Sequence, residues 1–212
     1  MIPSYRLGSR LRAVYEVVLK AQNQTAYSRI WDCCCDHGYL GLKILQNNLC
    51  EKLIFVDQVP HIIQNLSLKL GSFCSDQYEL FTVDAGELSF ESHQRHLVIL
   101  SGVGGECMVD IIRAIAGRQG DASIDYIFCP SASTNALRKY LNSQNFTLLS
   151  ETIACEKKRY YEILLVRTKE SAGELPDVSL TNTMWQADNT GHQQHLAKLS
   201  CHEGKKLLAT IG

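Results

Sequence analysis

Short apolar runs alternate with stretches of helical periodicity along most of the chain. The apolar runs predict strands at 30–35, 52–56, 78–83, 97–100 and 126–129. Apolar positions at helical spacing predict helices at 9–20, 39–46, 62–70, 106–116 and 135–142. Strands that read as continuous apolar runs are buried on both faces, and alternation with helices requires parallel crossovers. The pattern therefore predicts an α/β domain of five β/α units.

Two further apolar segments, 146–152 and 160–167, are separated only by a charged stretch. This connection is too short for a crossover helix and predicts an antiparallel hairpin. Five β/α units followed by a hairpin is the order of the Rossmann-like class I methyltransferase sheet, which is mostly parallel and has seven strands. A plain dinucleotide-binding fold does not need the hairpin. We expect a domain over 1–168 with an N-terminal helix, and a linker and C-terminal helical segment over 169–212, with an amphipathic helix at 192–208.

The composition, with 45% hydrophobic and 20% charged residues, is that of a soluble globular protein. No apolar run approaches the roughly 20 residues of a membrane span, and the N-terminus lacks the apolar core of a signal peptide. Three of the nine cysteines are consecutive, and no pair has zinc-knuckle or CxxC spacing. We therefore predict a cytoplasmic protein with reduced thiols, no metal and no membrane partner, and a monomer is the favoured oligomeric state.

The net charge of −1 does not by itself indicate a nucleic-acid partner, but the charge is unevenly spread. Residues 1–30 carry five basic residues against Glu16 alone, and a second basic cluster lies at 157–159. Such clusters are either solvated faces or contacts for phosphate groups.

Aspartates follow three of the predicted strands. Asp32 ends the first strand, where a carboxylate can accept a hydrogen bond from a cofactor ammonium and Gly38 admits a ligand close to the backbone. Asp57 could bind both ribose hydroxyls, and Asp84 could accept from an adenine amino group, with Ala85 leaving room for the ring. Taken singly, Asp32 could be a helix cap and Asp57 a turn residue. Together the three aspartates form a row suited to a nucleoside.

The fourth strand leads into a glycine-rich run, Ser101-Gly102-Val103-Gly104-Gly105. The run lacks the lysine of a phosphate loop and does not follow the first strand, so we interpret it as a wall of the cofactor and target-base pocket. Ser131, after Pro130, could offer a hydroxyl to a planar substrate, although an ordinary serine-rich loop is the alternative. The predicted cofactor-binding residues are Asp32, Cys34, Gly38, Asp57, Gln58, Asp84, Ala85, Ser101 and Gly102.

These residues resemble a known family, the bacterial tRNA (adenine-22-N1)-methyltransferases called TrmK. The resemblance is carried by the following segments, in order, over residues 5–167: Leu7-Gly8-Ser9-Arg10-Leu11, Asp32-x-x-x-Asp36-His37-x-Tyr39-Leu40, Ser101-Gly102-Val103-Gly104-Gly105 and Arg159-Tyr160-Tyr161-Glu162-Ile163-Leu164. The chain departs from the family where Cys34 replaces a glycine and Ser131 an asparagine, and where the C-terminal extension is shorter.

The resemblance implies S-adenosylmethionine as cofactor and N1 of an adenine in tRNA as the methyl acceptor. Because N1 already carries a lone pair, the enzyme would act by proximity, alignment and exclusion of water on a flipped base. Asp36 could orient the exocyclic amine and Tyr39 could form an aromatic wall, so both are predicted catalytic residues. The structural alternatives are a helix cap for Asp36 and a packed first-turn aromatic for Tyr39. The predicted substrate-binding residues are Arg10, His37, Gly104, Pro130, Ser131 and Arg159.

Two other functions stay open at this stage. One is a methyltransferase that acts on a small molecule or a protein, which salt-insensitive RNA binding would favour. The other is a non-catalytic module that binds S-adenosylmethionine without turnover, an alternative raised by the cysteines of the first loop. A nicotinamide-dependent oxidoreductase is disfavoured because the first loop lacks GxGxxG.

Overall fold

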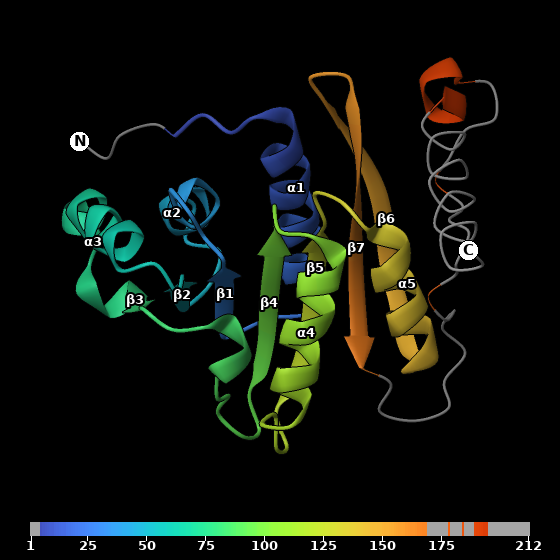
Figure 1. Cartoon of the computed structure of the whole chain (residues 1–212). Coiled ribbons are helices and arrows are strands. Elements are labelled where there is room, and N and C mark those ends of the chain that lie inside the picture. Colours follow the sequence, from blue (N-terminus) through green and yellow to red (C-terminus); the bar gives the residue numbers. More distant parts are fainter. Residues whose placement is uncertain (1–4, 169–177, 179–183, 185–188, 195–212) are drawn as a thin grey trace.

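The computed structural model describes residues 5–168, 178, 184 and 189–194. Seven strands form one sheet in the order β3-β2-β1-β4-β5-β7-β6 (Figure 1). All neighbouring strands are parallel except β7, which is antiparallel to both β5 and β6. The strands are β1 (Arg29–Cys33), β2 (Lys52–Val56), β3 (Tyr78–Phe81), β4 (Arg95–Ser101), β5 (Ser123–Cys129), β6 (Phe146–Glu156) and β7 (Arg159–Thr168). The predicted mostly parallel sheet with a terminal hairpin is confirmed.

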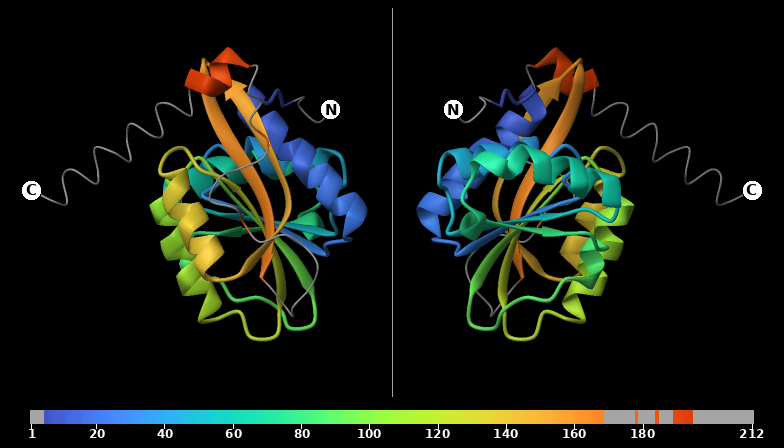
Figure 2. Two further views of the ribbon diagram at one scale, coloured as in Figure 1. Left: turned by 90° about the vertical axis from the view of Figure 1, so that its right-hand side faces the viewer. Right: turned by 90° about the vertical axis from the view of Figure 1, so that its left-hand side faces the viewer.

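Helices cover both faces of this sheet (Figure 2). They are α1 (Ser9–Gln24), α2 (Tyr39–Gln46), α3 (Pro60–Lys69), α4 (Gly105–Ala116) and α5 (Thr134–Ser143). Alternate strand residues point to opposite faces, so β4 sends Leu97 and Ile99 toward α1, α2 and α3. It sends Val98 and Leu100 toward α4 and α5. Both faces of the central strands are thus dry, which explains their continuous apolar sequences.

The connection between β3 and β4 contains no α-helix. It holds only the 3-10 turn η3 (Ala85–Glu87). Asp84 caps the N-terminus of this turn, because its side chain accepts a hydrogen bond from the Gly86 N–H at 2.7 Å. Leu88 and Phe90 then pack into the core as extended chain. No helix was predicted between the third and fourth strands, in agreement with the structure, so only four of the five predicted β/α units contain a helix.

The β6–β7 hairpin extends beyond the rest of the sheet. Strand β7 pairs with β5 only from Leu164 to Arg167, so its first residues continue past the end of β5. The two-residue turn places Lys157 and Lys158 at φ 49° and 63°, the left-handed conformation of tight hairpins. In Figure 1 the tip of the hairpin and the start of α1 lie at the same edge, toward which β4 points.

Parts of the C-terminal segment pack on the domain. The Val178 N–H donates to the Phe146 carbonyl at 3.3 Å, and the Asn142 side chain donates to the Val178 carbonyl at 3.0 Å. Residues 190–194 are helical, and the buried His192 ring meets Tyr160 edge-on at 5.2 Å. Most of the predicted linker and of the helix at 192–208 lies outside the described residues. Among the described helices, none has the length and apolar character needed to cross a membrane.

Candidate cofactor and substrate site

A cavity of about 480 Å³ lies at the carboxyl edge of the parallel strands. The ends of β1, β2 and β4, the segment after β3, and the first turns of α1, α2 and α4 line it. The sequence-predicted residues that the cavity brings together are Arg10, Asp32, Cys34, Asp36, His37, Gly38, Tyr39, Asp57, Gln58, Asp84, Ala85, Ser101 and Gly102. Four predicted residues are outside its lining: Gly104, Pro130, Ser131 and Arg159.

The loop from β1 to α2 follows an unusual backbone path. Cys34, Asp36 and Gly38 have φ values of 55°, 49° and 68°. A Cβ on Gly38 would also come within 2.6 Å of the Leu66 side chain, so both the dihedral and the packing require glycine there. Cys34 has no such freedom, and holding an L-residue in this conformation costs about 1–2 kcal/mol. The loop is therefore a strained segment bent around the cavity.

Asp32 supplies a buried carboxyl group at the floor of this loop. Its side chain accepts a hydrogen bond from the Gly41 N–H at 3.0 Å. Burial raises the pKa of Asp32 to about 7, the Gly41 hydrogen bond opposes the rise, and the nearby Asp57 adds to it. Asp32 therefore does bind the first turn of α2, as the helix-cap alternative proposed. Its other oxygen, Oδ1, accepts no hydrogen bond from the described residues and can still accept one from a ligand.

Asp57 ties the loop to β2. Its two carboxylate oxygens accept from the Asp36 and Val59 N–H groups, each at 3.1 Å. Each oxygen retains a second lone pair, so the group can still accept from ligand hydroxyls. Asp84 is exposed and uses one oxygen for Gly86. The three aspartates thus follow adjacent strands and present acceptors to one cavity.

Tyr39 forms an exposed aromatic surface at the opening of the cavity. Its side chain is 40% exposed, which excludes the packed first-turn interpretation. The rings of Tyr5 and His37 lie 6.1 and 5.5 Å from it, and the Lys69 ammonium lies 4.7 Å from its centroid. Among the described residues, the side-chain hydrogen bond to the first turn of α2 comes from Asp32, so Asp36 is not a helix cap. Both predicted catalytic residues are therefore available to a ligand.

The glycine-rich run after β4 forms one wall, as predicted for Gly102. Gly102 has φ 95°, and a Cβ there would lie 3.4 Å from Arg10 Nη2. The loop after β5 supports this wall from outside the cavity, because the Ser131 N–H donates to the Val103 carbonyl at 2.9 Å. Gly104 is the N-cap of α4, and Arg159 donates to the Ser131 carbonyl at 3.3 Å.

Most of the apolar part of the lining was not predicted, although Val103 belongs to the glycine-rich run that was expected to form a wall. The residues not predicted are Leu11, Cys35, Leu40, Val56, Ile62, Val83, Cys107 and Ile111. Several belong to the helical faces that also build the core, so their apolar character alone could not separate them from core positions. Their proximity to the carboxyl ends of strands was the available signal.

Comparison with known proteins identifies the fold family. A sequence model described as a methyltransferase domain matches residues 7–164, which is most of the chain. The chain belongs to this methyltransferase family. No curated protein sequence matches it.

Solved structures of methyltransferases share the fold at low identity. TrmK of M. capricolum, in complex with S-adenosyl-homocysteine, aligns with a TM-score of 0.70 and 17% identity over 100% of this chain and 89% of that one. The m1A22 tRNA methyltransferase TrmK of B. subtilis gives 0.64 and 18% over 78% and 68%. Sp1610 of Streptococcus pneumoniae, in complex with S-adenosyl-L-methionine, gives 0.64 and 21% over 79% and 77%. The predicted methyltransferase fold is confirmed.

Proposed function

We propose that the protein transfers a methyl group from S-adenosylmethionine to N1 of an adenine in tRNA. The observation that carries the proposal is the convergence of Asp32, Asp57 and Asp84 on one cavity beside the exposed ring of Tyr39. The fold of this domain and its similarity to the two TrmK structures support the same substrate.

The donor set fits this cofactor. Asp32 is a buried carboxyl group with a single hydrogen bond, and a cofactor ammonium would supply the positive charge that its ionised form lacks. Asp57 would accept from the ribose hydroxyls. Asp84 would accept from the adenine amino group, with Ala85, Cys107 and Ile111 bounding the ring. The sulfonium of the bound cofactor would supply an activated methyl group.

The residues at the opening of the cavity would handle the methyl acceptor. Tyr39 would stack on the flipped adenine and exclude water from it. Asp36 is exposed beside Tyr39 and would accept from the exocyclic amine, which turns N1 toward the cofactor. No residue needs to remove a proton before transfer, because N1 already has a lone pair. Catalysis would come from positioning, which can contribute several kcal/mol.

The charge distribution favours a polyanionic substrate. The exposed basic residues include Arg6 and Arg12, near the start of α1, and Lys157 and Lys158, in the turn of the hairpin. The start of α1 and the hairpin tip lie at the edge of the sheet toward which β4 points (Figure 1), and the cavity is lined from the ends of the parallel strands. These basic residues would contact RNA phosphates without selecting sequence. A tRNA substrate would also place the protein in the cytoplasm.

The test is methylation of an unmodified tRNA transcript with labelled S-adenosylmethionine, followed by nucleoside mass spectrometry. We expect 1-methyladenosine, a kcat/KM about 10–100-fold lower in Tyr39→Ala, and near-normal kcat/KM in Tyr39→Phe. His93→Ala, distant in the loop before β4, is the control. Cofactor binding without nucleoside methylation would favour a small-molecule or protein substrate. A folded protein that binds no cofactor would overturn the proposal.

A further inference from the structure

Two arginines that are far apart in the sequence lie against the same aromatic ring. The Arg10 guanidinium, from α1, lies 5.2 Å from the Tyr161 centroid, and that of Arg159, from β7, lies 5.6 Å from it. Arg10 also lines the cavity and approaches Gly102, whereas Arg159 donates to the Ser131 carbonyl just outside. This pair therefore places two positive charges beside the cavity.

Arg10 lacks the acidic partners that two other arginines of the domain have. Its Nε is buried and has no hydrogen-bond partner among the described residues. By contrast, Arg138 contacts Glu151 and Glu162 at 2.7 Å, and Arg167 contacts Asp125 at 2.6 Å. The ion pairs within the described part of the chain include neither Arg10 nor Arg159. A buried donor without an acceptor is unfavourable, so a ligand acceptor at this position would stabilise the site.

Glu156, an acidic residue beside Arg10, contacts the backbone of α1. Glu156 accepts from the Arg10 backbone N–H at 3.3 Å and lies against Gly8, so it caps the first turn of α1. The cap anchors the helix that carries Arg10 to the hairpin that carries Arg159. It thereby holds the start of α1 against the hairpin.

We propose that Arg10 and Arg159 bind a phosphate group next to the target base, with Tyr161 holding both side chains in place. Planar guanidinium groups suit the oxygens of a phosphate, and stacking on a ring limits the entropy lost on binding. The inference rests on the proposed function in taking the acceptor to be a nucleic acid. It adds that a backbone phosphate fixes how far the base enters the cavity, so free adenosine is a poor substrate.

The experiment measures the coupling between Arg10 and individual phosphates. An RNA hairpin containing the target adenosine is prepared as a series in which one phosphate at a time is replaced by an uncharged methylphosphonate. Dissociation constants are measured for the wild type, Arg10→Gln and Arg113→Gln. Arg113 is the matched control, because its guanidinium also lies over a tyrosine ring, 5.0 Å from Tyr140, but away from the cavity.

We expect neutralisation of one phosphate beside the target to weaken wild-type binding on the order of tenfold. Arg10→Gln should weaken binding of the unmodified RNA by a similar factor. Neutralising the same phosphate should then cause no further loss of affinity in this variant. The slope of log K against log salt should fall by about one in Arg10→Gln and stay unchanged in Arg113→Gln. An unchanged melting temperature of Arg10→Gln would exclude misfolding as the cause.

The outcomes separate this inference from the proposed function. The phosphate site would be overturned if the effects of Arg10→Gln and of each methylphosphonate on the binding free energy simply add. It would also be overturned if Arg10→Gln leaves the dissociation constant unchanged, even if the tRNA is methylated. Coupling at one phosphate in a protein that methylates no tRNA would support the site and overturn the proposed reaction. Absence of any RNA binding would overturn both.

Discussion

Asp32 and Asp125 are two buried aspartates of the same sheet with opposite surroundings. Asp125, near the start of β5, accepts from two nitrogens of Arg167 at 2.6 Å and from the Tyr27 hydroxyl. Asp32, near the carboxyl end of β1, accepts from one backbone N–H, and burial raises its pKa to about 7. The Asp125 carboxylate is neutralised inside the protein, whereas the Asp32 carboxyl group can still accept a hydrogen bond from a ligand.

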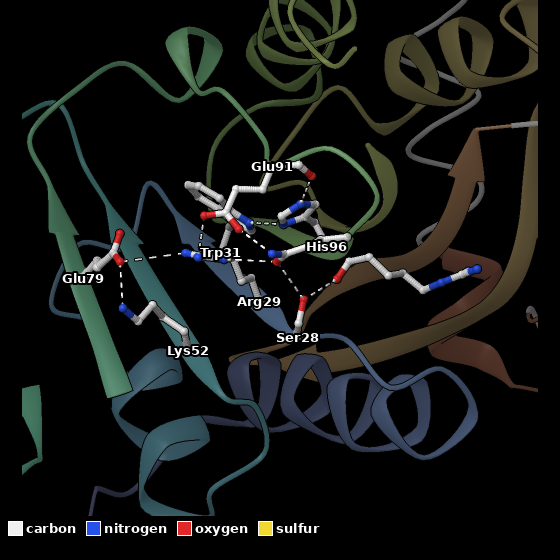
Figure 3. Close-up of polar contacts among 9 residues, drawn as sticks. Ser28, Arg29, Trp31, Lys52, Glu79, Glu91 and His96 are labelled. Carbon is white, nitrogen blue, oxygen red and sulfur yellow. Dashed lines mark hydrogen bonds and ion pairs between the residues drawn. The ribbon is translucent and has the colours of Figure 1, made fainter. Parts of the chain in front are cut away.

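The same contrast extends to the two edges of the sheet. Figure 3 shows the amino edge, where Arg29 contacts Glu91 at 2.5 Å and Lys52 contacts Glu79 at 2.9 Å. The Trp31 indole N–H donates to His96 Nδ1, and His96 Nε2 donates to the Glu91 carbonyl. Burial lowers the pKa of His96, which keeps its ring neutral in this arrangement. Polar groups that satisfy one another stabilise a fold, and polar groups left with free capacity make a binding site.

The largest expected effect comes from breaking the paired aspartate. Asp125→Ala removes the acceptor of two Arg167 hydrogen bonds and of the Tyr27 hydroxyl, so the free energy of unfolding should fall by about 3–5 kcal/mol. Urea denaturation measures this change. Cofactor affinity of the folded protein should be unaffected at low temperature. A loss under about 1 kcal/mol would contradict the assignment of Asp125 to stability.

Changing the unpaired aspartate should have the opposite consequence. Asp32→Asn removes the charge that would meet the cofactor ammonium, so affinity for S-adenosylmethionine should fall about 10–100-fold. The free energy of unfolding should not fall, and at pH 7 it should rise, since the amide can still accept from Gly41 without the cost of burying a charge. Calorimetric titration and urea denaturation give both values. A large loss of stability with unchanged affinity would make Asp32 a structural residue.

The pH dependence of cofactor binding sharpens the same comparison. The folded protein has an Asp32 pKa of about 7, raised from 3.8, so protonation below pH 7 competes with the cofactor ammonium. Affinity should fall by up to about tenfold per pH unit below 7, and Asp32→Asn should remove this dependence. In the free protein, the contribution of Asp32 to stability has the reverse sign: it is fully present below pH 3.8 and is lost as the pH rises through 7. Titrations at pH 6, 7 and 8 test the prediction.

The smallest effect concerns Cys34. Cys34→Gly relieves the left-handed strain but adds freedom to the unfolded chain, so the free energy of unfolding should change by less than about 1 kcal/mol. Affinity for the cofactor should rise, because a thiol leaves the cavity lining. Cys107→Ala is the control, because it also removes a thiol from the cavity lining but from a residue in helix α4, where no backbone strain is relieved. Reduced affinity in Cys34→Gly would show that the thiol contributes a contact.

Much of the fold was predictable because local patterns determine it. The boundaries of α2 and β2 match the prediction, since turn residues interrupt the apolar pattern on both sides of each. The aspartate row was predictable because parallel strands end at one edge. The connection between β3 and β4 was predicted without a helix, and the structure buries Leu88 and Phe90 of this connection in the core.

The long-range part of the site could not be predicted. No local pattern places Arg10 beside Gly102 and Tyr161, because α1, β4 and β7 meet only after the sheet has formed. The left-handed φ of Cys34 was equally hidden, since the residue type gives no sign of it. The partners that distinguish Asp125 from Asp32 also come from distant segments.

The hydrogen bond from Arg10 to Glu156 joins residues 146 positions apart. It has a consequence for the order of events on the ribosome. Helix α1 is synthesised first, but the hairpin against which it packs emerges last. The pocket wall that α1 carries therefore reaches its final position only when translation of the domain is nearly complete. A nascent chain stalled before the hairpin would hold its central strands and still be unable to close the site around a methyl donor.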